Sequence, residues 1–322
     1  MRAVRLHAVG GPDALRVEEV PVPSAGPGDI LVRHASVGLN FIDIYQRDGL
    51  YPVPLPTTLG LEAAGTVEAV GEGVSRFRVG DRVAYCSTLG AYADANVVKA
   101  DRAVLVPDGV SFETAAACLL KGLTAEFLVR RIWPLTAGDT VLVQAAAGGV
   151  GLILCQWLKA AGLTVIGCVG SDAKADLARD HGCAEVIVSS REDVPARVRA
   201  LTGGSGVRVA YDSVGRTTLD GSLSSLSRRG LLVSFGNASG PPEPVDPLRL
   251  SRGGSLYLTR PTLFDYVSTP QELDVAAAAL FEVLARGEVS IRIGQTFRLE
   301  DAAAAHTALA ARETTGATLL RL

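Results

Sequence analysis

The sequence predicts an α/β protein with two parts, a doubly wound parallel sheet and a mostly antiparallel β domain. Three observations support this. The chain has 322 residues, more than one hydrophobic core usually serves. Up to about residue 120 it is rich in Gly, Pro and short Val-rich segments. From about residue 138, apolar strands alternate with helical segments of about 10 residues, which is typical of βαβ units.

The first part predicts short antiparallel strands. Residues 29–37 (DILVRHASV), 64–70 (AGTVEAV) and 81–86 (DRVAYC) are apolar runs bounded by turn signals. Gly-Pro pairs and the series Pro52, Pro54, Pro56 mark loops between such runs. The pattern is that of a barrel-like domain.

The second part predicts parallel strands covered by helices on both faces, because its strands are continuously apolar. The expected strands are 140–144, 163–170, 184–188, 207–215 and 231–237, and the expected helices between them are 148–162, 172–182, 191–204 and 218–230. Ser171 or Asp172 is the N-cap candidate of the second helix. Beyond residue 255 we expect a segment at 255–261, a helix at 271–286, a segment at 291–299 and a helix at 301–311. This tail is expected to return partly to the first domain.

Composition excludes several classes of protein. The net charge is −3, without the basic excess that nucleic acid or an anionic membrane requires. No apolar signal core opens the chain, and the most apolar windows are broken by glycines, so we expect a cytoplasmic protein. The five cysteines form no CxxC pair and the four histidines no cluster, so no metal site is expected.

A small-residue turn carries the main functional signal. Residues 145–151 (AAAGGVG) follow a predicted strand and open a predicted helix, the context that a dinucleotide fingerprint requires. Gly148 and Gly151 occupy the second and third glycine positions, and Ala146, with a negative φ, can replace the first. The helix N-terminus would offer N–H groups to a pyrophosphate. We therefore predict a nicotinamide dinucleotide, the alternative being a merely structural turn.

The segment after the next predicted strand indicates whether the cofactor is NAD or NADP. It reads Gly170-Ser171-Asp172-Ala173-Lys174, where NAD enzymes place a carboxylate for the ribose 2′-hydroxyl. Lys174 suits a 2′-phosphate as a point charge, unless it is a solvated helix lysine. Asp172 either opposes this or caps the following helix. We favour NADPH.

These motifs resemble the quinone oxidoreductase and zeta-crystallin signature of the medium-chain dehydrogenase/reductase superfamily. The matching residues are Gly138, Asp139, Leu142, Ala146, Ala147, Gly148, Gly149, Gly151, Gln156 and Lys159. Other stretches resemble bacterial NADPH:quinone reductases, in order along the chain: 40–45, 49–52, 80–83, 120–124, 211–215, 234–237 and 259–261.

The resemblance implies a two-domain subunit. Residues 1–122 and 260–322 would form a GroES-like catalytic domain, and residues 123–259 a Rossmann NADPH-binding domain. Nicotinamide and substrate would lie in the cleft between them. Members of the family are commonly homodimers or tetramers.

The resemblance also implies chemistry without zinc. Zinc alcohol dehydrogenases carry a ligand cysteine where this chain has Asn40, and a ligand histidine where it has Leu61. Cys118 lies near the region of the third ligand, and one thiolate cannot make a zinc site. Without a Lewis acid, quinones and conjugated enones are better acceptors than plain ketones.

Site residues carry over by position. Asn40, Tyr45 and Tyr51 are the candidate donors to the developing quinol oxygen, although Asn40 could instead brace a turn and Tyr51 pack a loop. The residues that the resemblance implies for the cofactor are Phe41, Ile42, Asp43, Ile44, Tyr45, Thr124, Phe127, Ala147, Gly148, Gly149, Val150, Gly170, Ser171, Lys174, Ser189, Val214, Phe235, Gly236, Asn237, Ala238, Pro261, Thr262, Leu263 and Arg312. Ser189 stands where many relatives have a tyrosine that assists the 2′-phosphate, so the preference for NADPH is expected to be weaker.

The favoured hypothesis is an NADPH:quinone oxidoreductase that transfers hydride or single electrons. The alternative is an NADPH-dependent reductase of enone or alkenal double bonds. A non-enzymatic role, as an NADPH-binding or RNA-binding protein, is the third, and the acidic balance of charge argues against it.

Overall fold

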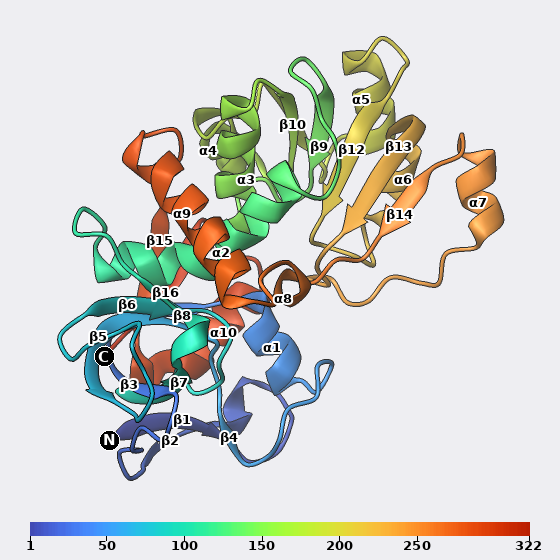
Figure 1. The fold of residues 1–322 in the computed structure, drawn as a ribbon. Coiled ribbons are helices and arrows are strands. Elements are labelled where there is room, and N and C mark those ends of the chain that lie inside the picture. The colour runs from blue at the N-terminus through green and yellow to red at the C-terminus, as the bar shows by residue number, and fades with distance from the viewer. The chain divides into compact units, whose positions relative to one another are not determined.

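The computed structural model describes residues 1–322, which form two compact units (Figure 1). Unit 1 contains Met1–Thr124, Tyr266–Ala285 and Ile291–Leu322, and unit 2 contains Ala125–Asp265 and Arg286–Ser290. The domain boundaries predicted from the sequence were residues 122 and 260, and the two units change at residues 124 and 265. The short segment Arg286–Ser290 was not anticipated in unit 2. The division of labour between a catalytic and a cofactor-binding domain remains a prediction.

Unit 1 is built mostly on antiparallel strands, the pair β15 and β16 being parallel. Its larger sheet has the order β15-β16-β3-β5-β6-β8, with β7 also paired to β3. The strands are β3 (Asp29–Leu39), β5 (Glu62–Val70), β6 (Arg82–Tyr85), β7 (Ala95–Lys99), β8 (Ala103–Leu105), β15 (Ile293–Arg298) and β16 (Ala317–Arg321). A smaller sheet joins β2 (Leu15–Glu19), β1 (Arg2–Leu6) and β4 (Thr57–Thr58). Because β16 pairs with β3, the C-terminal tail returns to the first domain, as predicted.

The helices of unit 1 include two that the sequence analysis missed. Helices α9 (Pro270–Ala285) and α10 (Ala302–Ala310) match the predicted ranges closely. Helix α1 (Phe41–Arg47) is too short to show a period. Helix α2 (Phe112–Arg130), which continues into unit 2, is buried on nearly all sides over residues 115–128, so it lacks an amphipathic pattern.

Unit 2 is a six-stranded parallel sheet of order β11-β10-β9-β12-β13-β14. Its strands are β9 (Thr140–Val143), β10 (Thr164–Val169), β11 (Glu185–Val188), β12 (Val207–Asp212), β13 (Leu226–Ser234) and β14 (Tyr257–Thr259). The helices α3 (Gly149–Ala160), α4 (Ala175–Asp180), α5 (Val194–Leu201) and α6 (Leu219–Ser224) connect them, and α7 (Pro247–Arg252) precedes β14 (Figure 1). The strand order reverses between β9 and β12, so the sheet is doubly wound, as predicted.

Three predicted helices of unit 2 are shorter than expected. The one expected over 191–204 spans only Val194–Leu201. The helix expected over 218–230 ends at Ser224, because β13 already begins at Leu226. Arg229 then adopts φ 58°, in the left-handed region, and the pairing of β12 with β13 shifts register there. The helix expected over 172–182 starts as a 3₁₀ turn and is α-helical only over Ala175–Asp180. No helix of the protein is long and apolar enough to cross a membrane.

Candidate functional site

The small-residue turn in unit 2 has the geometry that the fingerprint needs. Helix α3 begins at Gly149 with Gly148 as its N-cap, and the N–H groups of its first turn have no acceptor within the helix. A Cβ on Gly151 would lie 2.3 Å from the carbonyl oxygen of Ala145, so only glycine fits. A Cβ on Gly148 would meet only that oxygen, at 3.1 Å, so its other sides are open. The left-handed residue is Ala145 (φ 52°) rather than Ala146.

The loops after β10 and β11 lie next to each other. Ser189, which follows β11, donates hydrogen bonds from its N–H (2.9 Å) and its hydroxyl (3.1 Å) to the carbonyl oxygen of Val169, the last residue of β10. Ser171 occupies the N-cap position of the following turn but makes no capping bond with its side chain. Asp172 pairs with Arg191 at 2.8 Å, instead of capping the helix. Gly170, Ser171, Lys174 and Ser189, predicted to hold the ribose and 2′-phosphate, therefore come from adjacent loops.

A buried carboxylate, which the sequence analysis missed, organises the loop after β12. Asp212 is fully buried, and its Oδ1 accepts the N–H groups of Val214 (2.9 Å) and Gly215 (3.0 Å). Its Oδ2 accepts the hydroxyl of Ser222 at 2.7 Å. The prediction had placed Asp212 and the following Ser-Val-Gly inside the strand 207–215, whereas the strand ends at Asp212.

The loop after β13 is joined to the one after β12. The N–H of Phe235 donates to the carbonyl oxygen of Asp212 (2.8 Å), and that of Ala238 to the carbonyl oxygen of Ser213 (3.2 Å). A Cβ on Gly236 would lie 2.3 Å from the latter oxygen. Pro261, Thr262 and Leu263 follow β14 in the same way. Because the strands are parallel, these predicted cofactor residues share one edge of the sheet with Ala147, Gly148, Gly149 and Val150.

Two further predicted cofactor residues lie in helix α2. Phe127 is 1% exposed, and Thr124, at the end of unit 1, is also buried. The Thr124 hydroxyl donates to the carbonyl oxygen of Leu120 at 2.8 Å. Arg312, which follows α10, is exposed and adopts φ 60°.

In unit 1, Asn40 belongs to a buried polar cluster around Glu62. Asn40 Nδ2 donates to Glu62 Oε2 at 2.8 Å, and Lys121 Nζ donates to the same oxygen at 3.1 Å. The N–H of Leu120 donates to Glu62 Oε1 at 2.7 Å. Glu62 is fully buried and Lys121 is 5% exposed. The side-chain amide of Asn40 is therefore engaged with the Glu62 carboxylate, and a role for Asn40 as donor to the substrate stays a prediction.

Asp43 faces the interior of unit 1. Its Oδ2 accepts the N–H of Asn40 (2.8 Å) and the hydroxyl of Tyr92 (2.9 Å), while its Oδ1 has no partner. Burial raises the pKa of this carboxyl to about 7. His306 Nε2 lies 3.0 Å from the Tyr92 hydroxyl and its Nδ1 3.3 Å from Arg47 Nη1. Burial lowers the pKa of His306 to about 3, so it is a neutral link in this chain.

Three aromatic side chains cluster at helix α1. The ring centroids of Phe41 and Tyr45 are 6.2 Å apart, and those of Tyr45 and Tyr51 are 5.2 Å apart in a T-shaped arrangement. Tyr51 is fixed by its N–H, which donates to the carbonyl oxygen of Tyr45 at 3.0 Å. Of the neighbouring residues in the sequence, Ile44 is buried and Ile42 is half-buried. The structure thus brings Tyr45 and Tyr51 together, with Phe41 next to Tyr45.

At the positions where zinc alcohol dehydrogenases have their zinc ligands, this chain has side chains that do not suit zinc. Leu61 is a buried apolar side chain. Cys118 is fully buried, and both burial and the charge of Glu62 raise the pKa of its thiol, which disfavours the thiolate that binds zinc. No group of three His, Cys, Asp or Glu side chains is placed to hold a metal ion.

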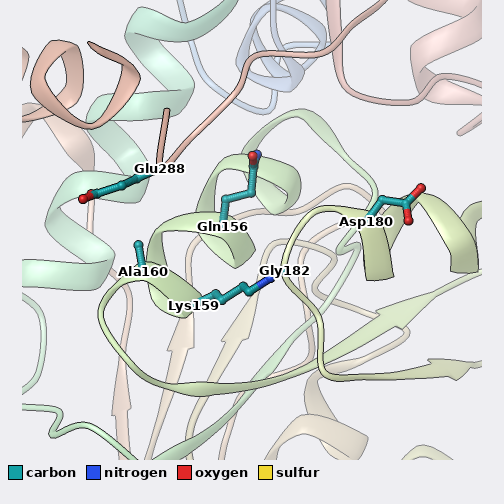
Figure 2. Close-up of a pocket in the computed structure, with 6 residues that line it drawn as sticks. All are labelled: Gln156, Lys159, Ala160, Asp180, Gly182 and Glu288. Carbon is teal, nitrogen blue, oxygen red and sulfur yellow. The ribbon is translucent and has the colours of Figure 1, made fainter. Parts of the chain in front are cut away.

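A polar pocket of about 280 Å³ lies elsewhere in unit 2. It is lined by Gln156, Lys159, Ala160, Asp180, Gly182 and Glu288 (Figure 2). Gln156 Oε1 accepts the N–H and the hydroxyl of Ser290, both at 3.0 Å, and its Nε2 donates to the Ser290 carbonyl oxygen, also at 3.0 Å. These bonds hold the segment Arg286–Ser290 on unit 2, which explains why this segment departs from the predicted division.

Two family models match the chain. The alcohol dehydrogenase GroES-like domain matches residues 26–108, and the zinc-binding dehydrogenase model matches residues 149–278. With the doubly wound sheet and its small-residue turn, these matches define an oxidoreductase of the medium-chain dehydrogenase/reductase superfamily.

Full-length relatives narrow the class further. The chain is 52% identical to a quinone oxidoreductase of Pseudomonas aeruginosa, over 99% of both chains. It matches the crystal structure of Escherichia coli quinone oxidoreductase complexed with NADPH, with a TM-score of 0.98, 45% identity and 100% coverage of both chains. It is also 41% identical to a 2-haloacrylate reductase of a Burkholderia species, over 99% of this chain and 98% of the relative. The chain belongs to the quinone oxidoreductase family.

Proposed function

We propose that this protein reduces quinones to hydroquinones with NADPH as the electron donor and without zinc. The observation that carries the proposal is the 52% identity to a quinone oxidoreductase over 99% of the chain. In the overall reaction NADPH and one proton reduce the quinone, and NADP⁺ and the hydroquinone leave. NADPH, when bound, supplies the hydride equivalent.

The residues of unit 2 fit a dinucleotide phosphate. The open side of Gly148 and the N–H groups at the start of α3 suit the pyrophosphate, which the positive end of the helix would attract. Lys174 and Ser189 belong to adjacent loops after β10 and β11 and suit the 2′-phosphate. NADPH, rather than NADH, is the expected cofactor.

The cluster around Glu62 supports a site without zinc. The ammonium of Lys121 and the amide of Asn40 satisfy the Glu62 carboxylate, and a protonated Cys118 thiol is a poor metal ligand. Quinones accept hydride without Lewis-acid help, so an ordered, dry site suffices. Tyr45 and Tyr51 are the proposed donors to the substrate oxygen, and the ring cluster with Phe41 suits a flat acceptor. Asn40 then acts by holding the start of α1.

The test is NADPH oxidation, followed at the cofactor's absorbance, with 1,4-benzoquinone or 9,10-phenanthrenequinone after EDTA treatment. We expect turnover that survives the chelator, and NADH in parallel to give lower rates. A control variant is Tyr257→Phe, an exposed tyrosine at the start of β14, which should leave turnover unchanged. Loss of activity on chelation, with recovery on adding zinc, would refute the zinc-free chemistry.

A second candidate is reduction of an activated carbon–carbon double bond. The 41% identity to a 2-haloacrylate reductase favours it, since the same protein frame serves that reaction in the relative. Enones and 2-chloroacrylate assayed beside the quinones distinguish the two. Fast turnover of these alkenes with negligible turnover of quinones would favour the second candidate.

A homodimer and a cytoplasmic location stay predictions from the sequence. Light scattering of the purified protein tests whether it is a homodimer.

A further inference from the structure

Arg191 lies at the point where the ribose of a dinucleotide would meet unit 2. It follows β11 by three residues, and its guanidinium reaches the turn after β10. Arg191 Nη2 lies 2.8 Å and its Nε 3.3 Å from Asp172 Oδ1. Asp172 stands three residues beyond Val169, the last residue of β10. In doubly wound sheets this is the position whose side chain meets the ribose 2′-substituent.

The carboxylate of Asp172 has opposite effects on the two cofactors. It can accept the 2′-hydroxyl of NADH, and it would repel the 2′-phosphate of NADPH. The guanidinium of Arg191 offsets that negative charge and, with five N–H donors, has enough of them to serve Asp172 and a phosphate at once. A guanidinium is cationic at any working pH, and the hydrogen bond with Asp172 raises the pKa of Arg191 further.

Two other acidic residues, Glu192 and Asp193, follow Arg191 directly in the sequence, and each also has partners of its own. Glu192 Oε1 accepts the N–H of Val188 at 2.9 Å and lies 4.0 Å from Arg191 Nη1. Asp193 caps helix α5 by accepting the N–H of Ala196 at 2.8 Å. Glu192 Oε2 also lies 3.7 Å from Arg197 Nε, so a second guanidinium offsets its charge. The formal charges of Asp172, Lys174 and Arg191 then sum to a positive value, and without Arg191 they sum to zero.

We propose that Arg191 is the residue that determines preference for the 2′-phosphate in this protein, by shielding Asp172 and by donating hydrogen bonds to the phosphate. The proposal rests on the proposed use of NADPH. Lys174 supplies the second cation. Asp172, freed of Arg191, would turn the same site toward NADH.

The test is direct binding of two cofactor fragments by isothermal titration calorimetry: adenosine 2′,5′-bisphosphate, which carries the 2′-phosphate, and 5′-AMP, which does not. Arg191→Ala should lower the affinity for the bisphosphate by about tenfold or more, the loss of one charge-assisted hydrogen bond, and leave the affinity for 5′-AMP equal or higher. The loss should shrink in high salt. Arg179→Ala removes an equally exposed arginine that pairs with Asp176 at 2.8 Å, and should change neither affinity.

A second binding experiment tests the role of Asp172. The double variant Asp172→Asn with Arg191→Ala should bind the bisphosphate more tightly than Arg191→Ala alone, because the repulsion is gone. The proposal is overturned if Arg191→Ala behaves like Arg179→Ala, if it weakens both fragments equally, or if the double variant shows no recovery. Quinone turnover by the unchanged protein is scored separately. Its absence, with the fragment preference intact, would refute the proposed reaction and leave the role of Arg191 standing.

Discussion

Replacing Lys121 by methionine should destabilise unit 1 specifically. The substitution keeps the length of the side chain and removes its charge, leaving the Glu62 carboxylate buried with Asn40 Nδ2 and the N–H of Leu120 as its remaining partners. Glu62 is fully buried and Lys121 is 5% exposed, so little water can replace the ammonium. Breaking a buried pair on one side costs about 3–5 kcal/mol of the free energy of unfolding.

Urea unfolding measured with two probes tests this. Both tryptophans, Trp133 and Trp157, lie in unit 2, whereas far-UV circular dichroism reports on both units. With a slope of about 2 kcal/mol per molar urea, the loss corresponds to a shift of about 2 M in the midpoint for unit 1. We expect Lys121→Met to produce an early dichroism transition, while tryptophan fluorescence changes at its former midpoint.

The double variant Lys121→Met with Glu62→Gln completes the cycle. It removes both charges, so it should be less destabilised than the sum of the two single variants. Coincident transitions by both probes in Lys121→Met, a midpoint shift below about 0.5 M, or strict additivity would refute the reasoning that the ion pair holds unit 1 together.

Three further predictions follow. Gly151→Val should reduce NADPH affinity by about tenfold or more in a fluorescence titration, because its Cβ has no space at the turn; unchanged affinity would contradict the close packing. The raised pKa of Asp43 means that the native state keeps a proton that the unfolded chain releases near pH 4, so this group lowers stability as pH rises from 4 to 7. The lowered pKa of His306 acts in the opposite sense, so Asp43→Asn should make the midpoint of unfolding rise more steeply with pH, and an unchanged slope would refute the assignment. Gln156→Ala should speed amide hydrogen exchange at Ser290, measured by mass spectrometry; equal exchange would show that other contacts hold that segment.

The sequence predicted what periodicity and small residues encode. The parallel sheet and the turn at 145–151 follow from local patterns, and the tail was expected to return to the first domain, although its pairing with β3 was not predicted. Helix α2 was not predicted, because its burial on nearly all sides leaves no polar face that would show a helical period. The helix expected over 218–230 was too long, since the left-handed Arg229 and the start of β13 depend on tertiary pairing rather than on propensity.

The sequence predicted which residues lie at the candidate site better than it predicted which side chains they contact. The resemblance singled out Asn40 and Asp43, yet their partners Glu62 and Tyr92 are 22 and 49 residues further along the chain. Such pairings are set by the sheet register, which one sequence does not encode locally. Arg191 was missed for the same reason, because its distance to Asp172 depends on β10 and β11 being neighbours.

The pairing of β3 with β16 has a consequence for biosynthesis. Residues 37–39 of β3 must wait for residues 318–320, nearly the whole chain later, before they gain their second neighbouring strand. Unit 2 is complete once Ser290 has been made. A nascent chain therefore carries an unfinished strand edge while unit 2 is already able to fold, and such an edge is where misassembly starts. Loss of residues 318–320 would leave β3 without this neighbour, whereas every residue of the parallel sheet of unit 2 would still be present.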